Sequence, residues 1–189
     1  MRTKTFIVGI KGYNEIMFDR VAFDNTKIGK VLTLPWDEKV YLSESNPGQL
    51  VIPTINIFSM LTNLSDGAPY LKEKKAAEAR RQCINVKRTI SFSDKEALLL
   101  RNGKPATIAD CEHHQSKAPD PKAHSPILTS RPVLNSVWST EFKINIIEIA
   151  GINSLVIQTY IELAGSLVGL GTNRGPYGKF EMVKWEEVI

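Results

Sequence analysis

A glycine-rich connection near the end of the chain constrains the fold more than any other feature. Glycine, basic and aromatic residues lie close together in it: Gly169, Gly171, Arg174, Gly175, Tyr177, Gly178 and Lys179. A helical apolar pattern precedes this connection, and an alternating strand pattern follows it. This order is the reverse of a dinucleotide-binding turn, in which the glycines follow a strand and open a helix. The chain is therefore expected to end as helix, glycine loop and strand.

The composition of this loop also suggests a binding role. Glycine allows the backbone to adopt positive φ and to approach another surface closely. Exposed N–H groups beside Arg174 and Lys179 would suit an anion, and the ring of Tyr177 could stack on a base. The alternative is a turn that only changes the direction of the chain.

Alternating apolar residues predict strands over 3–11, 137–149 and 179–185. In the first of these strands, Phe6, Val8 and Ile10 should share one face. Shorter strands are expected at 39–43, 84–92 and 98–100, the last followed by an Asn102–Gly103 hairpin turn.

Two amphipathic helices are expected. One opens at Val51 with Pro53 in its first turn, and its buried stripe would be Ile55, Phe58, Leu61 and Leu64. The other is capped by Asn153, and its apolar face would comprise Leu155, Val156, Tyr160, Leu163, Ala164 and Leu167. A third helix, over 70–82, is rich in Ala, Lys and Glu and should face solvent.

In chain order the strong elements read strand, helix, strand, strand, helix, strand. We therefore expect an α+β fold of the ferredoxin-like (RRM-like) βαββαβ type, with an antiparallel sheet, helices on one face and long inserted loops. The length of 189 residues suits a single domain over 1–189. Two insertions are expected within it: a basic helix/strand insertion at 66–92, and a polar, proline-rich projecting loop at 110–132.

Positive charge is concentrated in one segment. The chain as a whole has a formal net charge of +4. Residues 72–88, the basic segment, contain two carboxylates, Glu73 and Glu78, and the following cations: Lys72, Lys74, Lys75, Arg80, Arg81, Lys87 and Arg88. A basic segment on a nearly neutral body favours a polyanionic partner. The alternative is a solvated helix face.

Catalytic and metal-binding signals are weak. The sequence contains no Gly-x-Ser-x-Gly elbow, no phosphate-binding loop and no Cys-x-x-Cys pair. Zinc would require Cys83, Cys111 and His113 to meet across distant segments. General acid–base cleavage of RNA could use His113, His114 or His124. We expect a protein that is not an enzyme and that uses no cofactor or metal.

The chain start reads as a strand and not as a signal peptide, and no run approaches the roughly 18 apolar residues of a membrane span. With Cys83 and Cys111 as the two cysteines, a reducing cytoplasm is expected.

The element order and the spacing Gly169-x-Gly171-x6-Gly178 between the last helix and last strand resemble the RAMP superfamily. These are ferredoxin-fold, RNA-binding proteins of CRISPR (Cas) antiviral defence complexes. Two further stretches resemble the corresponding ones of small RAMP-like proteins of bacteriophages and prophages. One is the expected helix start Val51-Ile52-Pro53, and the other is the final loop and strand around Arg174, Tyr177 and Phe180. The resemblance covers roughly half of the chain and places it in a bacterial or phage-infected cell. It implies that Gly169, Gly171, Gly175 and Gly178 form a loop that meets a nucleic-acid backbone. It also implies that the two insertions project between neighbouring subunits.

Together these features predict a non-catalytic protein that binds single-stranded nucleic acid, RNA more than DNA, with low sequence specificity. Its partners would be the strand and copies of itself or CRISPR-type effector subunits in an oligomer. Two alternatives stay open. One is a metal-independent endoribonuclease that processes guide RNA. The other is a phage protein that mimics or inhibits a CRISPR complex, whose free sheet face, near Trp138 or Trp185, would be apolar.

Overall fold

The computed structural model describes residues 3–23, 26, 31–62, 76–118, 127–174 and 176–188. Its largest element is an antiparallel sheet with the strand order β12-β1-β11-β7-β5. The bounds of these strands are β1 Thr3–Gly12, β5 Val51–Pro53, β7 Glu96–Arg101, β11 Trp138–Ile147 and β12 Phe180–Val188. Two short strands extend it: β6 (Ile90–Phe92) pairs with β11, and β8 (Lys104–Pro105) pairs with β7. The mixed α+β class is therefore confirmed.

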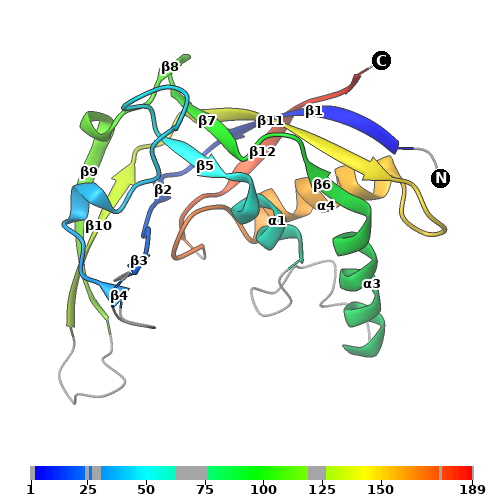
Figure 1. The fold of residues 1–189 in the computed structure, drawn as a ribbon, viewed down its shortest axis with the longest axis horizontal. Coiled ribbons are helices and arrows are strands. Elements are labelled where there is room, and N and C mark those ends of the chain that lie inside the picture. The colour runs from blue at the N-terminus through cyan, green and yellow to red at the C-terminus, as the bar shows by residue number, and fades with distance from the viewer. Residues whose placement is uncertain are drawn as a thin grey trace.

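Alternation along the strands separates a buried face from a polar one. Phe6, Val8 and Ile10 of β1 are buried, as expected, and they lie beside buried Phe142 and Ile144 of β11. Helices α1 (Thr54–Thr62), α3 (Ala76–Thr89) and α4 (Ser154–Leu167) lie on one side of the sheet (Figure 1). The core therefore lies between the helices and this face.

The other face of the main sheet is charged. Lys184 of β12 lies 3.3 Å from Glu141 of β11 and 3.6 Å from Glu186. Trp138 is fully buried, and its indole N–H donates to the carbonyl of Asn14 over 2.8 Å. Trp185 stacks on Phe6 with ring centroids 4.6 Å apart. The apolar free face expected for a protein-binding mimic is not observed among the described strands.

Helix α1 begins at Thr54, after β5, so Pro53 ends a strand instead of opening the helix. Its buried side chains include Ile57, Met60 and Leu61, whereas Ile55 is 65% exposed. Of the predicted stripe, Leu61 is buried and Phe58 packs partly buried against the core, so only Ile55 of its described residues was wrong; three-residue steps drift around a helix of 3.6 residues per turn. The buried residues Ile57, Met60 and Leu61 are spaced i, i+3 and i+4, and this spacing keeps them on one face of the helix. Leu64 lies outside the described residues.

Helix α3 continues to Thr89, so the strand predicted over 84–92 was wrong except at β6. Ala79, Cys83, Val86 and Ile90 are buried, while Ile84 is 47% exposed. The apparent alternation of Ile84, Val86 and Arg88 coincided with helical spacing that begins at Ala79. A short apolar run of this kind does not distinguish a helix from a strand.

Helix α4 is capped as predicted, because Asn153 Oδ1 accepts from the Val156 N–H over 3.0 Å. Ile157, Tyr160, Ile161 and Ala164 are buried. Two members of the predicted apolar face, Leu155 (66%) and Leu167 (56%), are exposed. Apolar residues cover more of α4 than the sheet can bury, so the sequence did not indicate which of them point inward.

A second sheet, of order β2-β10-β9, stands where the sequence predicted an irregular loop. β9 (Cys111–Ala118) and β10 (Ile127–Leu134) form an antiparallel hairpin, and β2 (Ile16–Met17) pairs with the base of β10. The hairpin points away from the main sheet (Figure 1). Because much of it is solvated on both faces, its strands carry no apolar alternation that a sequence could reveal.

The remaining described elements are short: β3 (Ala22–Phe23), β4 (Val31–Leu32) and the 3₁₀ turns η1 (Trp36–Glu38) and η2 (Ile108–Asp110). The strand expected at 39–43 is reduced to a single bridge between Leu42 and Leu50. The Asn102–Gly103 turn is confirmed, with φ values of 51° and 76°. None of the described helices has the length and apolar character of a membrane span.

Candidate nucleic-acid interface

Helix α3 carries the described part of the basic segment. Arg80, Arg81, Lys87 and Arg88 are all exposed; Arg81 and Arg88 lie roughly opposite buried Cys83, and Arg80 and Lys87 lie on the flank between the two sides. With 100° between successive residues, these four cations span roughly a third of the helix circumference. Lys87 and Arg88 also lie in the last turn, where cations stabilise the helix dipole. Lys72, Lys74 and Lys75 lie outside the described residues.

The inner face of α3 fixes the helix to the body. Cys83 Sγ donates to the Thr62 carbonyl of α1 over 2.7 Å, and Gln82 Nε2 donates to the Tyr160 hydroxyl of α4. Burial raises the pKa of the Cys83 thiol, so the thiol is protonated at neutral pH. The outward cations are therefore presented on a helix held at two points.

The glycine loop, residues 169–179, is braced by the chain segment that follows β1. The Asn14 side chain donates to the Pro176 carbonyl over 2.5 Å and accepts from the Lys179 N–H over 2.7 Å. The Thr172 N–H donates to the Met17 carbonyl over 2.8 Å. This role of Asn14 was missed, because a lone asparagine in an irregular segment gives no signal for a contact this far along the chain.

Three glycines of the loop leave no room for a side chain, and a Cβ on the first of them, Gly169, would lie 2.7 Å from the Tyr177 carbonyl oxygen. A Cβ on Gly171 would overlap the Met17 carbonyl oxygen, and one on Gly178 would overlap the backbone of Leu170; both residues have positive φ. The Gly178 N–H donates to the Glu15 carbonyl over 2.7 Å, and the Leu170 N–H donates to the Gly178 carbonyl over 2.9 Å. These backbone donors, expected to be exposed for an anion, are used inside the protein. Gly169 is buried as well, and Gly175 lies outside the described residues.

Side chains give the loop its outer chemistry. Arg174 Nε donates to the Gly171 carbonyl over 3.1 Å, which fixes the guanidinium against the loop. Arg174 also lines a small pocket of about 140 Å³, together with Thr172 and Asn56 of α1. Lys179 is partly buried, and burial lowers its pKa. Tyr177 is half-buried, with its ring centroid 6.0 Å from that of His114.

The two described histidines lie on opposite faces of β9. His113 stacks on Trp36 with centroids 4.9 Å apart, whereas His114 meets Tyr177 edge to face. Neighbouring residues of a strand point in opposite directions, so the two imidazoles do not converge on one reaction centre. His124 lies outside the described residues.

The hairpin is tied to the body by an ion-pair cluster that the sequence did not predict. Asp19 accepts from Arg131 Nε of β10 over 2.7 Å and lies 3.5 Å from Lys39 Nζ. Its exposed fraction is 26%, so the pairs are only partly screened by solvent. Such partners cannot be matched from sequence before the fold places them side by side.

The weak zinc set is not assembled. Cys83 lies in α3 and Cys111 at the start of β9, at opposite ends of the molecule (Figure 1). In the part of the chain that the structure describes, no three His, Cys, Asp or Glu residues are placed to share a metal ion. Burial, with Asp110 alongside, raises the pKa of the Cys111 thiol to about 12. The proposed combination of Cys83, Cys111 and His113 was therefore wrong.

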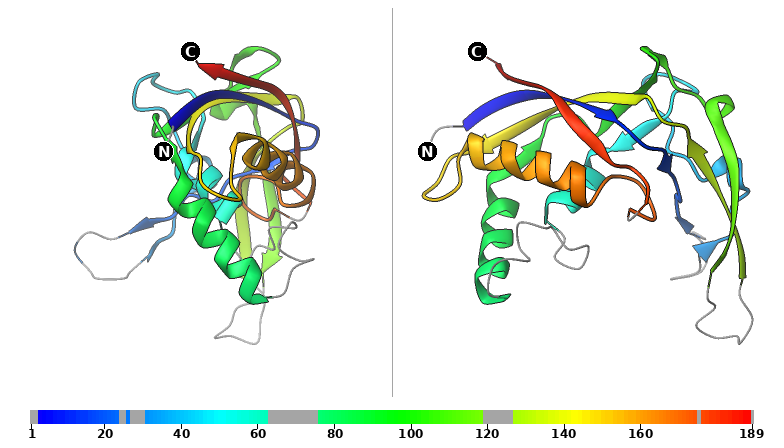
Figure 2. Two further views of the ribbon diagram at one scale, coloured as in Figure 1. Left: turned by 90° about the vertical axis from the view of Figure 1, so that its right-hand side faces the viewer. Right: turned by 180° about the vertical axis from the view of Figure 1, so that it is seen from behind.

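Three candidate binding elements share the helix side of the main sheet. Helix α3 and the β9–β10 hairpin extend from opposite ends of the sheet, and the glycine loop lies between them, separated from α3 by α1 (Figures 1 and 2). The loop contacts the hairpin directly through Tyr177 and His114. The arrangement brings loop and hairpin together and leaves α3 apart from them.

Comparisons with known proteins extend this description. No protein-family model and no curated protein sequence matches the chain. Among solved structures, it is similar to a chain described as "Cryo-EM structure of the Type III-B Cmr-beta bound to cognate target RNA". The TM-score is 0.59 at 16% identity, over 99% of this chain and 61% of the other. At this identity the similarity shows a shared fold only. This chain spans less than two thirds of the length of the other.

Proposed function

We propose that the protein is a RAMP-like, non-catalytic subunit that binds single-stranded RNA within an oligomeric, CRISPR-type ribonucleoprotein. Its domain would be ferredoxin-like, with β1, β7, β11 and β12 as the four principal strands. The strand order β12-β1-β11-β7 supports this assignment, since it is the 4-1-3-2 order of a βαββαβ unit. The target RNA bound by the structural neighbour favours RNA over DNA.

The observation that carries the proposal is the row of exposed cations on α3. Arg80, Arg81 and Arg88 project from a helix that is anchored through Cys83 and Gln82, so contact with phosphates requires no further ordering of the backbone. The wide spread of the cations suits a flexible strand better than a compact ligand. Contacts to phosphates position a strand without reading its sequence, which agrees with low specificity.

A stacking contact would complete the interface. Tyr177 and His114 bring two rings together where the glycine loop meets the hairpin, and Arg174 lies on the same loop. Stacking on an aromatic ring contributes about 1–3 kcal/mol per base and tolerates any sequence. The hairpin and α3 would then be the projections that flank the strand and contact neighbouring subunits.

The strand is not expected on the outer face of the main sheet. RRM domains bind bases there through exposed aromatic rings. Here that face carries Glu141, Lys143, Lys184 and Glu186, with Lys184 already paired to both carboxylates. Because the charges on this face neutralise one another, it does not attract phosphates. The residues named offer no aromatic ring on which a base could stack.

Binding of fluorescently labelled single-stranded RNA and DNA at several salt concentrations tests the proposal. The variant Arg80→Gln/Arg81→Gln/Arg88→Gln removes three cations from α3 while keeping helix propensity. We expect RNA affinity to fall, and the slope of log K against log salt to decrease by about 2, at roughly 0.7 per phosphate contact. Tyr177→Leu should weaken binding about fivefold or more without changing this slope.

The control is Lys11→Gln/Lys104→Gln/Lys143→Gln, which removes the same charge from exposed residues of the sheet strands. Equal losses in the two triple variants would mean that only net charge matters and would contradict an interface on α3. A purified protein that binds neither nucleic acid at low salt would contradict the function itself.

A further inference from the structure

A pocket lies beside the edge strand β5, apart from the cations on α3. Its volume is about 490 Å³. Four carboxylates and two cations line it: Asp37, Glu38, Glu44, Glu96, Arg20 and Lys95. Its net charge is therefore negative. A pocket of this sign repels a polyphosphate strand, so it requires a different partner.

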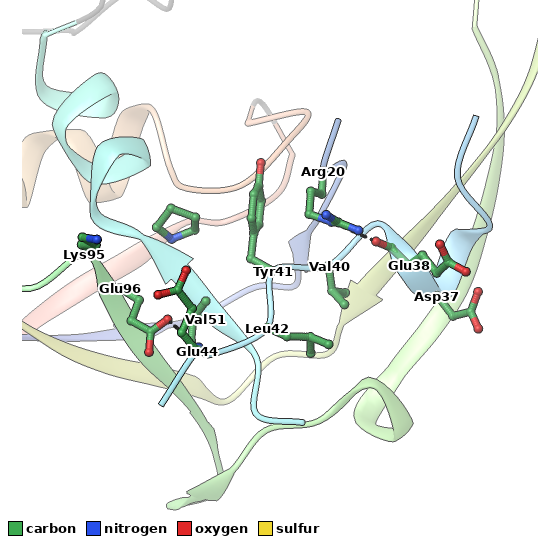
Figure 3. A pocket seen from close by; sticks show the side chains of 11 residues that line it. Arg20, Asp37, Glu38, Val40, Tyr41, Leu42, Glu44, Val51, Lys95 and Glu96 are labelled. Carbon is green, nitrogen blue, oxygen red and sulfur yellow. Dashed lines mark hydrogen bonds between the residues drawn. The ribbon is translucent and has the colours of Figure 1, made fainter. Parts of the chain in front are cut away.

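One end of the pocket holds a fixed negative charge. Glu96 accepts hydrogen bonds from Ser43 Oγ at 2.5 Å, Ser45 Oγ at 3.0 Å and the Glu44 N–H at 3.2 Å. These bonds, the one from Ser43 above all, lower the pKa of the Glu96 carboxyl. Glu96 is therefore ionised at neutral pH. Figure 3 shows Glu44 at the same end of the pocket.

The opposite end carries carboxylates that are free to accept. Figure 3 places Asp37 and Glu38 there, beside Arg20, whose Nε donates to the Glu38 backbone carbonyl over 3.2 Å. Within the described ranges, the side-chain oxygens of Asp37, Glu38 and Glu44 take part in no hydrogen bond or ion pair. An incoming donor would thus find carboxylates without competing partners.

The lining between the two ends is apolar. Val40, Tyr41 and Leu42 lie there, with Val51 of β5 (Figure 3). Leu42 is 52% exposed, although the residues on each side of it are tied to the body. This lining, apolar with a tyrosine ring and bordered by carboxylates, suits a side chain that ends in a cation. Its methylene groups can pack on the apolar residues while the charged group stays beside the carboxylates. A guanidinium also stacks on an aromatic ring, which an ammonium does less well.

We propose that this pocket binds an arginine side chain presented by a basic peptide segment of a partner protein. Charge complementarity identifies the ligand: the methylene stem packs on exposed Leu42, and the guanidinium bonds to Glu38 or Glu44 beside Tyr41. The site is independent of the nucleic-acid interface, and either can fail without the other.

Backbone amide NMR shifts of the full protein, titrated with acetyl-Gly-Arg-Gly-amide, test the assignment. We expect saturable shifts confined to residues 37–44, 51–53 and 95–96. The matched peptide with citrulline in place of arginine keeps the size and part of the N–H donors but loses the charge, and it should bind up to about fivefold more weakly. Equal binding of the two peptides would overturn the proposal. Free L-arginine that binds as tightly as the peptide would assign the site to a small cation and overturn a protein partner.

Two variants locate the contact. Glu38→Gln/Glu44→Gln should weaken arginine-peptide binding about fivefold. Tyr41→Leu should weaken it with an unchanged salt dependence. The control Glu162→Gln/Glu181→Gln removes the same charge from exposed residues of α4 and β12. Equal effects of the pocket and control variants would overturn the proposal, as would shifts outside the pocket. RNA affinity should be retained in the pocket variants.

Discussion

Individual residues decide whether the glycine loop can close. The loop combines positive φ with backbone contacts too close for a Cβ at Gly171 and Gly178. The same chain offers Gly48, with φ of 84° and open space around its Cβ position. Backbone strain and steric overlap can therefore be separated within one protein.

We predict that Gly178→Ala destabilises the fold by about 3 kcal/mol or more, because overlap with Leu170 adds to the strain of a left-handed residue. Gly48→Ala should cost about 1 kcal/mol, from strain alone. Urea unfolding measures both free energies. Equal costs would show that the loop relaxes around the new side chain.

Asp110 gives stability a defined pH dependence. Its carboxylate accepts from the Thr107 N–H over 2.8 Å and from Arg101 over 3.0 Å, and these bonds lower its pKa below the ordinary value of 3.8. A depressed folded pKa contributes stability that is complete above the unfolded pKa and is lost as pH falls through the folded one. Asp110→Asn should therefore be less stable than the parent at neutral pH. The difference should shrink below about pH 4. A gap that does not shrink as pH falls below the unfolded pKa would contradict an ionic origin.

At the scale of elements, the hairpin depends on few contacts with the body. Its base pairs with β2, and Arg131 reaches Asp19. We predict that Asp19→Asn raises amide hydrogen exchange in β9 and β10 about fivefold with little change in global unfolding, because it loosens one anchor of a local unit.

The control for this prediction is Lys184→Gln, which breaks ion pairs on the outer face of the main sheet. It should leave exchange in the hairpin unchanged. Faster exchange throughout the main sheet of Asp19→Asn would show that the hairpin is not a separate unit.

Over the whole molecule, the two ends of the chain meet in neighbouring strands. β12 pairs with β1 along most of its length, and Phe180 is buried beside Trp138. A chain that stops at Gly178 should lose cooperative unfolding, because β1 becomes an open edge and the core loses Phe180 and Trp185. A chain that stops at Glu187 serves as the control and should unfold as the full protein does. Calorimetry distinguishes the two.

Sequence reasoning succeeded where local pattern and burial agree. The long strands β1 and β11, the cap at Asn153 and the Asn102–Gly103 turn each carry their signal within a few residues. It failed where a pattern fits two periods, as over 84–92, or where both faces of a strand are solvated, as in the hairpin. It also could not indicate that the backbone N–H groups of the glycine loop point inward.

The sequence by itself determined the α+β class, the positions of the long strands and the exposure of Arg80 and Arg81, because alternation and charge are local properties of the chain. Only the tertiary structure decided that Asn14 braces the glycine loop, that Tyr177 meets His114 and that carboxylates gather beside β5. These contacts join residues far apart in sequence, and their energies depend on distances that no local pattern encodes.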